Sequence, residues 1–83
     1  MKRRLYAIRD SKMNEYNNPS VMASDAAAIR AFGDLVTKDK DTLVSNHPAD
    51  FSIWYIGDFD FVSGELEVCK PLLLATGTDY IKE

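Results

Sequence analysis

A short apolar run bounded by charged residues stands at the start of the chain, and apolar residues follow a helical period further along it. The segment RRLYAIRD (3–10) is read as a strand with Tyr6 and Ile8 on one face and Leu5 and Ala7 on the other, so both faces are partly apolar. The segment DAAAIRAFGDLV (25–36) has an apolar stripe at i, i+3, i+4 and i+7. Ser24 precedes this stripe and is typical of a helix N-cap. We therefore expect a strand near the N-terminus and a helix over about 24–37.

A second strand is expected in FSIWYIGDFD (51–60), which is apolar on both faces. In a regular strand, one face would carry Phe51, Ile53, Tyr55 and Phe59, and the other would carry Trp54 and Ile56. After a turn at Gly64, ELEV alternates again and predicts a hairpin over about 51–69. Residues 70–83 are expected to form a C-terminal tail that contains the apolar segment PLLLA.

This order of elements predicts an α+β fold in a single domain of 83 residues. The expected architecture is a two-layer β-α-β-β domain in which one helix packs on a small, mainly antiparallel, three-stranded sheet. The first strand is expected over residues 1–12. It can pair with either strand of the hairpin, because the rules for chain connections constrain handedness more than adjacency.

One helix can cover only one face of such a sheet, which leaves the apolar face around Trp54 without a partner. The segment PLLLA, a second subunit or stacked nucleic-acid bases are the three candidates to cover it. Contiguous exposed apolar surfaces usually mark interfaces. We expect a second subunit, in a homodimer or higher homo-oligomer, with the self-interface at Trp54, Tyr55 and Ile56.

Charge is distributed unevenly along the chain. The formal net charge is −3, yet residues 1–12 carry five cations and one acid, while residues 13–83 carry five cations and twelve acids. Basic N-terminal arms often contact nucleic acid. The candidate phosphate-binding residues are Lys2, Arg3, Arg4, Arg9 and Lys12, with Tyr6 as a candidate surface for base stacking. Single-stranded DNA is the expected partner, although the pattern also leaves duplex DNA open.

Catalytic and membrane-spanning functions are not indicated. His47 and Cys69 are the sole histidine and cysteine, so no transition-metal cluster is expected, and glycine-rich nucleotide-binding motifs are absent. The longest apolar run, at 71–75, is far shorter than the roughly 20 residues that a membrane span needs. The sequence predicts a non-enzymatic protein without cofactor, metal or membrane partner.

Several segments resemble the small non-structural protein of gokushoviruses, which are single-stranded DNA phages of the Microviridae. They are RLYAIRD, AAAIRAFGD and HPADFSIWYIGDFD followed by SGE, in that order. The resemblance implies a DNA-binding accessory protein that acts in single-stranded viral DNA synthesis or genome packaging, in the host cytoplasm. Viral replication or capsid proteins are possible further partners. The alternative is an oligomeric module that binds a viral or host replication protein and does not bind DNA.

Overall fold

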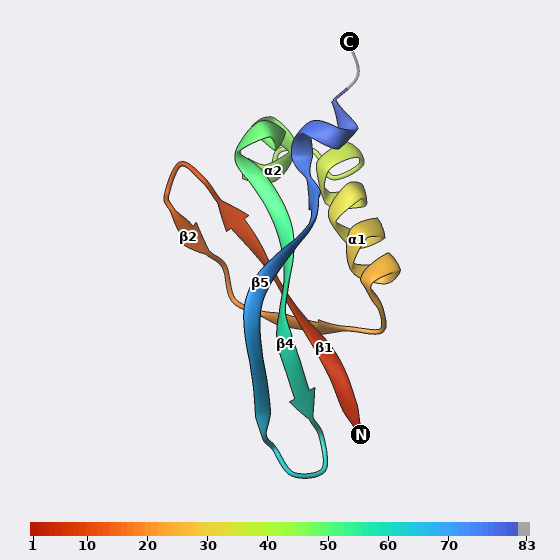
Figure 1. The fold of residues 1–83 in the computed structure, drawn as a ribbon. Helices are drawn as coiled ribbons and strands as arrows, with labels where there is room; N and C mark the ends of the chain where they lie inside the picture. The colour runs from red at the N-terminus through yellow and green to blue at the C-terminus, as the bar shows by residue number, and fades with distance from the viewer. Residues whose placement is uncertain (82–83) are drawn as a thin grey trace.

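Three long antiparallel strands, β1, β4 and β5, lie side by side, and helix α1 packs beside them (Figure 1). The structure is a computed structural model and describes residues 1–81. Its elements are β1 (Lys2–Asp10), β2 (Glu15–Tyr16), β3 (Ser20–Met22), α1 (Asp25–Thr37), α2 (Leu43–Asn46), β4 (Phe51–Asp60) and β5 (Leu66–Thr76), with short 3-10 helices η1 (Pro48–Asp50) and η2 (Gly77–Tyr80). The sheet order is β2-β1-β4-β5, and β3 also pairs with β1.

The α+β class and the mostly antiparallel sheet are confirmed, but the expected number of elements is wrong. Within residues 1–81 the sheet has five strands instead of three, and there are two α-helices instead of one. Strands β2 and β3 have two and three residues and lie in a polar segment, so they carry no alternating pattern. Their pairing with β1 makes them strands.

Helix α1 begins and packs as its sequence predicts. The Ser24 hydroxyl accepts a hydrogen bond from the Ala27 backbone N–H at 3.1 Å, which is an N-cap worth about 1 kcal/mol. Ala28, Phe32 and Val36 from the apolar stripe are buried. They share the hydrophobic core with Tyr6 and Phe51 of the sheet, together with Ile53 and Ala75. The stripe therefore packs on the face of the sheet that carries these residues.

Strand β5 replaces most of the expected C-terminal tail. The hairpin extends from Phe51 to Thr76 and not to residue 69, so PLLLA belongs to a sheet strand. Pro71 is tolerated there because β5 is an edge strand and because the pairing is irregular opposite Ile56. Leu73 pairs with Trp54 as a neighbour in the sheet. PLLLA is therefore no lid over the Trp54 face, and residues 82–83 lie outside the described part of the chain.

The position of β1 between β4 and the two short strands resolves the strand order that the sequence left open. One residue of β4, Ile56, is extra relative to β1, because Tyr6 faces Tyr55 and Leu5 faces Gly57. Such a bulge reverses the alternation of side chains beyond it. Among residues 1–81, no helix has the length and apolar character needed to cross a membrane.

Candidate nucleic-acid interface

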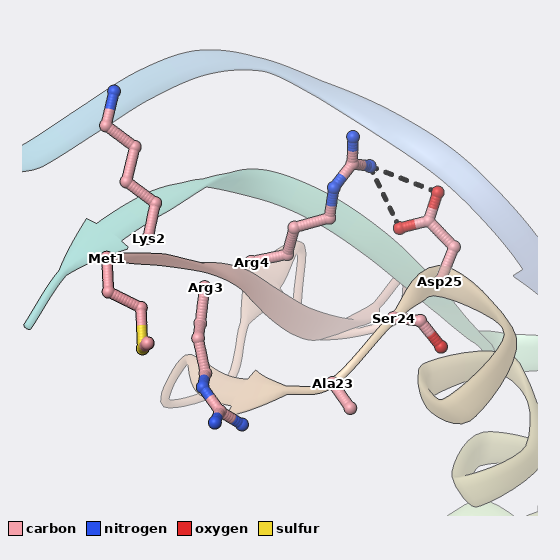
Figure 2. A pocket seen from close by; sticks show the side chains of 7 residues that line it. All are labelled: Met1, Lys2, Arg3, Arg4, Ala23, Ser24 and Asp25. Atoms are coloured by element: carbon pink, nitrogen blue, oxygen red, sulfur yellow. Dashed lines mark hydrogen bonds and ion pairs between the residues drawn. The ribbon is translucent and has the colours of Figure 1, made fainter.

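The two faces of the sheet differ because side chains alternate along β1. Tyr6 is buried against α1, so Lys2 and Arg4 point to the helix side, and Arg3 and Arg9 point to the opposite side. Figure 2 shows Arg3 directed away from Lys2 and Arg4. We call the side away from α1 the open face. Its residues are Arg3, Leu5, Ala7 and Arg9 of β1, with Trp54 and Phe59, which pair with Ala7 and Arg3.

Aromatic rings lie next to both arginines of the open face. At one end, the Arg9 guanidinium carbon lies 5.9 Å from the ring centroid of Tyr16, and Tyr16 meets Trp54 edge to face at 6.0 Å. At the other end, the Arg3 guanidinium carbon lies 5.8 Å from the ring centroid of Phe61. This open face therefore combines two cations with several aromatic rings.

Arg3 and Arg9 also differ from the other basic residues of β1 in having no acidic partner. Within residues 1–81, neither has a carboxylate within 4.0 Å. Arg9 donates a hydrogen bond to the side-chain oxygen of Asn14, which is neutral. Lys12 is exposed in the loop after β1, at the same end as Arg9. The charges of these three residues are free to interact with an external anion.

The helix-side cations, Lys2 and Arg4, are paired within the chain. Arg4 Nη1 lies 3.0 and 3.1 Å from the two carboxylate oxygens of Asp25, and dashed lines mark these two contacts in Figure 2. Lys2 forms an ion pair with Glu67. Hydrogen bonds to these carboxylates raise the pKa of both cations. The five predicted phosphate-binding residues therefore fall into two groups. Lys2 and Arg4 already have carboxylate partners, whereas Arg3, Arg9 and Lys12 do not within residues 1–81.

An open hollow of about 700 Å³ lies at the N-terminal end of β1, and Figure 2 shows the side chains that line it. It is lined by Met1, Lys2, Arg3, Arg4, Ala23, Ser24 and Asp25. Because Asp25 holds Arg4 and Glu67 holds Lys2, Arg3 is the lining cation without a carboxylate partner among residues 1–81. The hollow therefore adds space for a ligand beside Arg3.

Acidic side chains gather on the helix side of the hairpin. Asp58, Asp60, Glu65 and Glu67 line a hollow of about 260 Å³ together with Lys2. Backbone N–H groups of Val62 and Ser63 donate to Asp60, and these bonds lower the pKa of its carboxyl. This side of the hairpin therefore repels phosphate, whereas the open face attracts it.

Tyr6 is not available for base stacking, so its expected role as a stacking surface is wrong. Its side chain is 0% exposed and lies in the core with Ala28 and Phe32. Its hydroxyl donates to Asp25 at 2.7 Å, and burial together with this hydrogen bond raises the pKa of the phenol. The face that α1 covers is the one that carries Tyr6, and the sequence pattern alone did not show which face that is.

Tyr6 should make the fold sensitive to alkali. Because its pKa is raised above the ordinary 10.0, its contribution to stability is complete below about pH 10 and is lost as pH rises further. We expect Tyr6→Phe to lose less unfolding free energy than the wild type between neutral and strongly alkaline pH, measured by urea denaturation. Tyr16→Phe is the matched control. Because Tyr16 is 43% exposed, this variant should lose as much unfolding free energy in alkali as the wild type. An identical alkaline loss in Tyr6→Phe and the wild type would contradict this role.

The three residues of the expected self-interface do not form one surface. Tyr55 lies on the helix side, where its hydroxyl donates to Asp58 at 2.8 Å and the Arg4 guanidinium lies 4.4 Å from its ring centroid. Ile56 is the extra residue at the bulge. Trp54 is half-buried on the open face, and its Nε1 donates to the Ser52 hydroxyl at 2.7 Å. The expected self-interface residues therefore do not share one face of the sheet, because strand alternation separates Tyr55 from Trp54.

Two aromatic residues of the open face were missed by sequence reasoning. Tyr16 lies in a polar segment and joins the face only because β2 pairs with β1. Phe61 follows β4 in the hairpin turn and packs edge to face on Phe59 at 5.2 Å. The available signal was weak, since a single aromatic residue in a polar loop indicates neither a strand nor a binding surface.

No candidate metal centre is present in the described part of the chain. Residues 1–81 contain no group of three or more histidine, cysteine, aspartate or glutamate residues that could hold a metal ion.

The fold and the open face define a small α+β domain that presents arginine and aromatic side chains on one side of its sheet. The family described as Phage ORF5 protein matches residues 3–80, and the chain belongs to this family. Searches of the curated proteins and of the solved structures gave no match. The family places the chain among phage proteins and leaves its biochemical role to be inferred from the open face.

Proposed function

We propose that this protein binds single-stranded DNA through the open face, without catalysis. It acts as a non-structural accessory protein in the synthesis or packaging of a single-stranded DNA genome, in the cytoplasm of a bacterium infected by a gokushovirus. Two lines support this proposal. The chain belongs to a phage protein family, and its N-terminal, helix and hairpin segments resemble the gokushovirus protein.

The observation that carries the proposal is the placement of Arg3 and Arg9 beside aromatic rings on one face. Proteins that bind single strands combine cations along the backbone path with aromatic side chains on which bases stack. The two arginines are six residues apart on β1, which corresponds to about 20 Å at roughly 3.4 Å per residue.

The aromatic side chains favour a single strand over a duplex. Trp54 and Tyr16 form an edge-to-face pair, and Phe59 and Phe61 form another. An unpaired base can stack on such rings, whereas the bases of a duplex are already stacked on each other. The net charge of −3 and the acidic hollow on the helix side should limit nonspecific coating of DNA.

Fluorescence anisotropy with a labelled single-stranded oligonucleotide tests this function. We expect binding that weakens with salt and exceeds binding to the same sequence as a duplex. If Arg3, Arg9 and Lys12 each contact one phosphate, the slope of log affinity against log salt should be about −2. No binding at low salt and micromolar protein would contradict the proposal. Equal binding to duplex would contradict the role of base stacking.

A further inference from the structure

The turn between β1 and β2 holds Asn14 next to Arg9. Asp10 and Glu15 pair at the ends of the two strands, so the chain reverses direction over residues 11–14. The side chain of Asp10 accepts hydrogen bonds from two backbone N–H groups of this turn, at 3.0 and 3.3 Å. Asn14 has a φ of 57°, in the left-handed region that asparagine tolerates better than most residues. The turn therefore places the Asn14 side chain within reach of Arg9.

The Arg9 guanidinium is fixed by two neighbours. Its Nη2 group donates a hydrogen bond to the side-chain oxygen of Asn14. Its central carbon lies 5.9 Å from the ring centroid of Tyr16, which pairs with Arg9 across the two strands. A guanidinium has five N–H donors, so a bond to one acceptor leaves the others for a phosphate.

The chemistry of its acceptor distinguishes Arg9 from Arg4. Arg4 donates to both carboxylate oxygens of Asp25, so its positive charge is compensated within the chain. The amide oxygen of Asn14 is neutral and fixes the guanidinium of Arg9 without cancelling its charge. Arg9 is therefore both positioned and available to an anion.

The aromatic rings at this end of the open face are positioned as well. Trp54 Nε1 donates to the Ser52 hydroxyl at 2.7 Å, and Ser52 pairs with Arg9 in the sheet. Tyr16 contacts both the Arg9 guanidinium and the Trp54 ring, which it meets edge to face at 6.0 Å. The cation and the two rings are therefore already in place before a ligand binds.

We propose that Asn14 is a positioning residue for single-stranded DNA. Its neutral side chain holds Arg9 beside Tyr16 and Trp54, so that one nucleotide binds there with its phosphate on Arg9 and its base on Trp54. Side chains that are ordered before binding lose less entropy on binding, so the held arginine binds the strand more tightly than a free one would. This role rests on the proposed function and adds to it a residue that has no charge and stacks on no base.

Two substitutions at Asn14 separate the position of Arg9 from its charge. Aspartate and glycine both tolerate the positive φ, so each variant should keep the turn. Asn14→Asp places a carboxylate on Arg9 and removes a phosphate contact, so the slope of log affinity against log salt should fall in magnitude by about 0.7. Asn14→Gly frees the guanidinium but leaves its charge, so the slope should stay the same and the affinity should decrease about 2- to 10-fold. Anisotropy with the labelled single-stranded oligonucleotide measures both quantities.

Asn17→Asp is the matched control, because it adds the same charge at the opposite end of β2. Asn17 accepts a hydrogen bond from the Ile8 backbone N–H at 2.7 Å, which a carboxylate can also accept. This variant should keep the wild-type salt slope. An unchanged slope in Asn14→Asp, an unchanged affinity in Asn14→Gly, or an equal loss of slope in Asn17→Asp would overturn the proposal.

Proton exchange in the free protein distinguishes a failure of the positioning role from a failure of the proposed function. In the isotope-labelled wild type, the Arg9 guanidinium protons should exchange with water more slowly than in Asn14→Gly, as measured by NMR. Equal exchange would overturn the positioning role of Asn14 whether or not DNA binds. Slow exchange in a wild type that binds no DNA would contradict the proposed function, and the role of Asn14 in DNA binding with it.

Discussion

The double variant Arg3→Glu, Arg9→Glu should lose nearly all affinity for single-stranded DNA. Both arginines are without a carboxylate partner among residues 1–81, so each reversal replaces an attraction to phosphate with a repulsion. We expect a decrease of about 100-fold or more at low salt, and a salt slope reduced in magnitude by roughly 1.4, since each lost contact removes about 0.7. Anisotropy titrations at several salt concentrations measure both quantities.

A matched control separates the open face from net charge. Arg30→Glu, Lys40→Glu changes the formal net charge by the same amount, from −3 to −7. Arg30 is exposed on α1 and Lys40 is exposed in the segment that follows it, both away from the arginines of the open face. This variant should keep most of its affinity. Equal losses in the two double variants would show that the binding depends on overall charge and does not use the open face.

Gly77→Ala should destabilise the fold more than any exposed substitution. A Cβ at Gly77 would overlap the carbonyl oxygen of Pro48 and lie 2.9 Å from its Cα. These are backbone atoms of η1, so they cannot move aside by a side-chain rotation, and η1 and η2 would have to separate. We expect a loss of about 3 kcal/mol in unfolding free energy. For a domain of this size, this corresponds to a decrease in Tm of roughly 12–24 °C.

Gly64→Ala is the control for this prediction. Gly64 has a φ of 77°, so alanine costs about 1–2 kcal/mol there, but no heavy atom lies within 4 Å of the position of its Cβ. Urea denaturation followed by circular dichroism measures both variants. If Gly77→Ala is no less stable than Gly64→Ala, the close packing of η2 on η1 is not a determinant of stability.

The elements that depend on local chemistry were predictable. Ser24 and the apolar stripe after it identify α1, since a cap and a helical period are properties of neighbouring residues. Short runs of apolar and aromatic residues bounded by polar, turn-rich segments identify β1 and most of β4 for the same reason. The end of β5 was not predictable, because a proline such as Pro71 usually indicates that a strand has ended. A strand can continue through Pro71 only because β5 is at the outer edge of the sheet.

The candidate site, like the fold, was predictable from the sequence only in part. The sequence by itself determined that β1 is basic and that its cations alternate between two faces. Only the tertiary structure decided which face α1 covers, and this choice buries Tyr6, pairs Arg4 with Asp25 and leaves Arg3 and Arg9 on the open face. The contact of Tyr16 with Trp54 also required the pairing of β1 with β4, which are far apart in the chain. The physical reason is that alternation is a local property of the backbone, whereas burial of one face depends on packing between segments that are far apart in the chain.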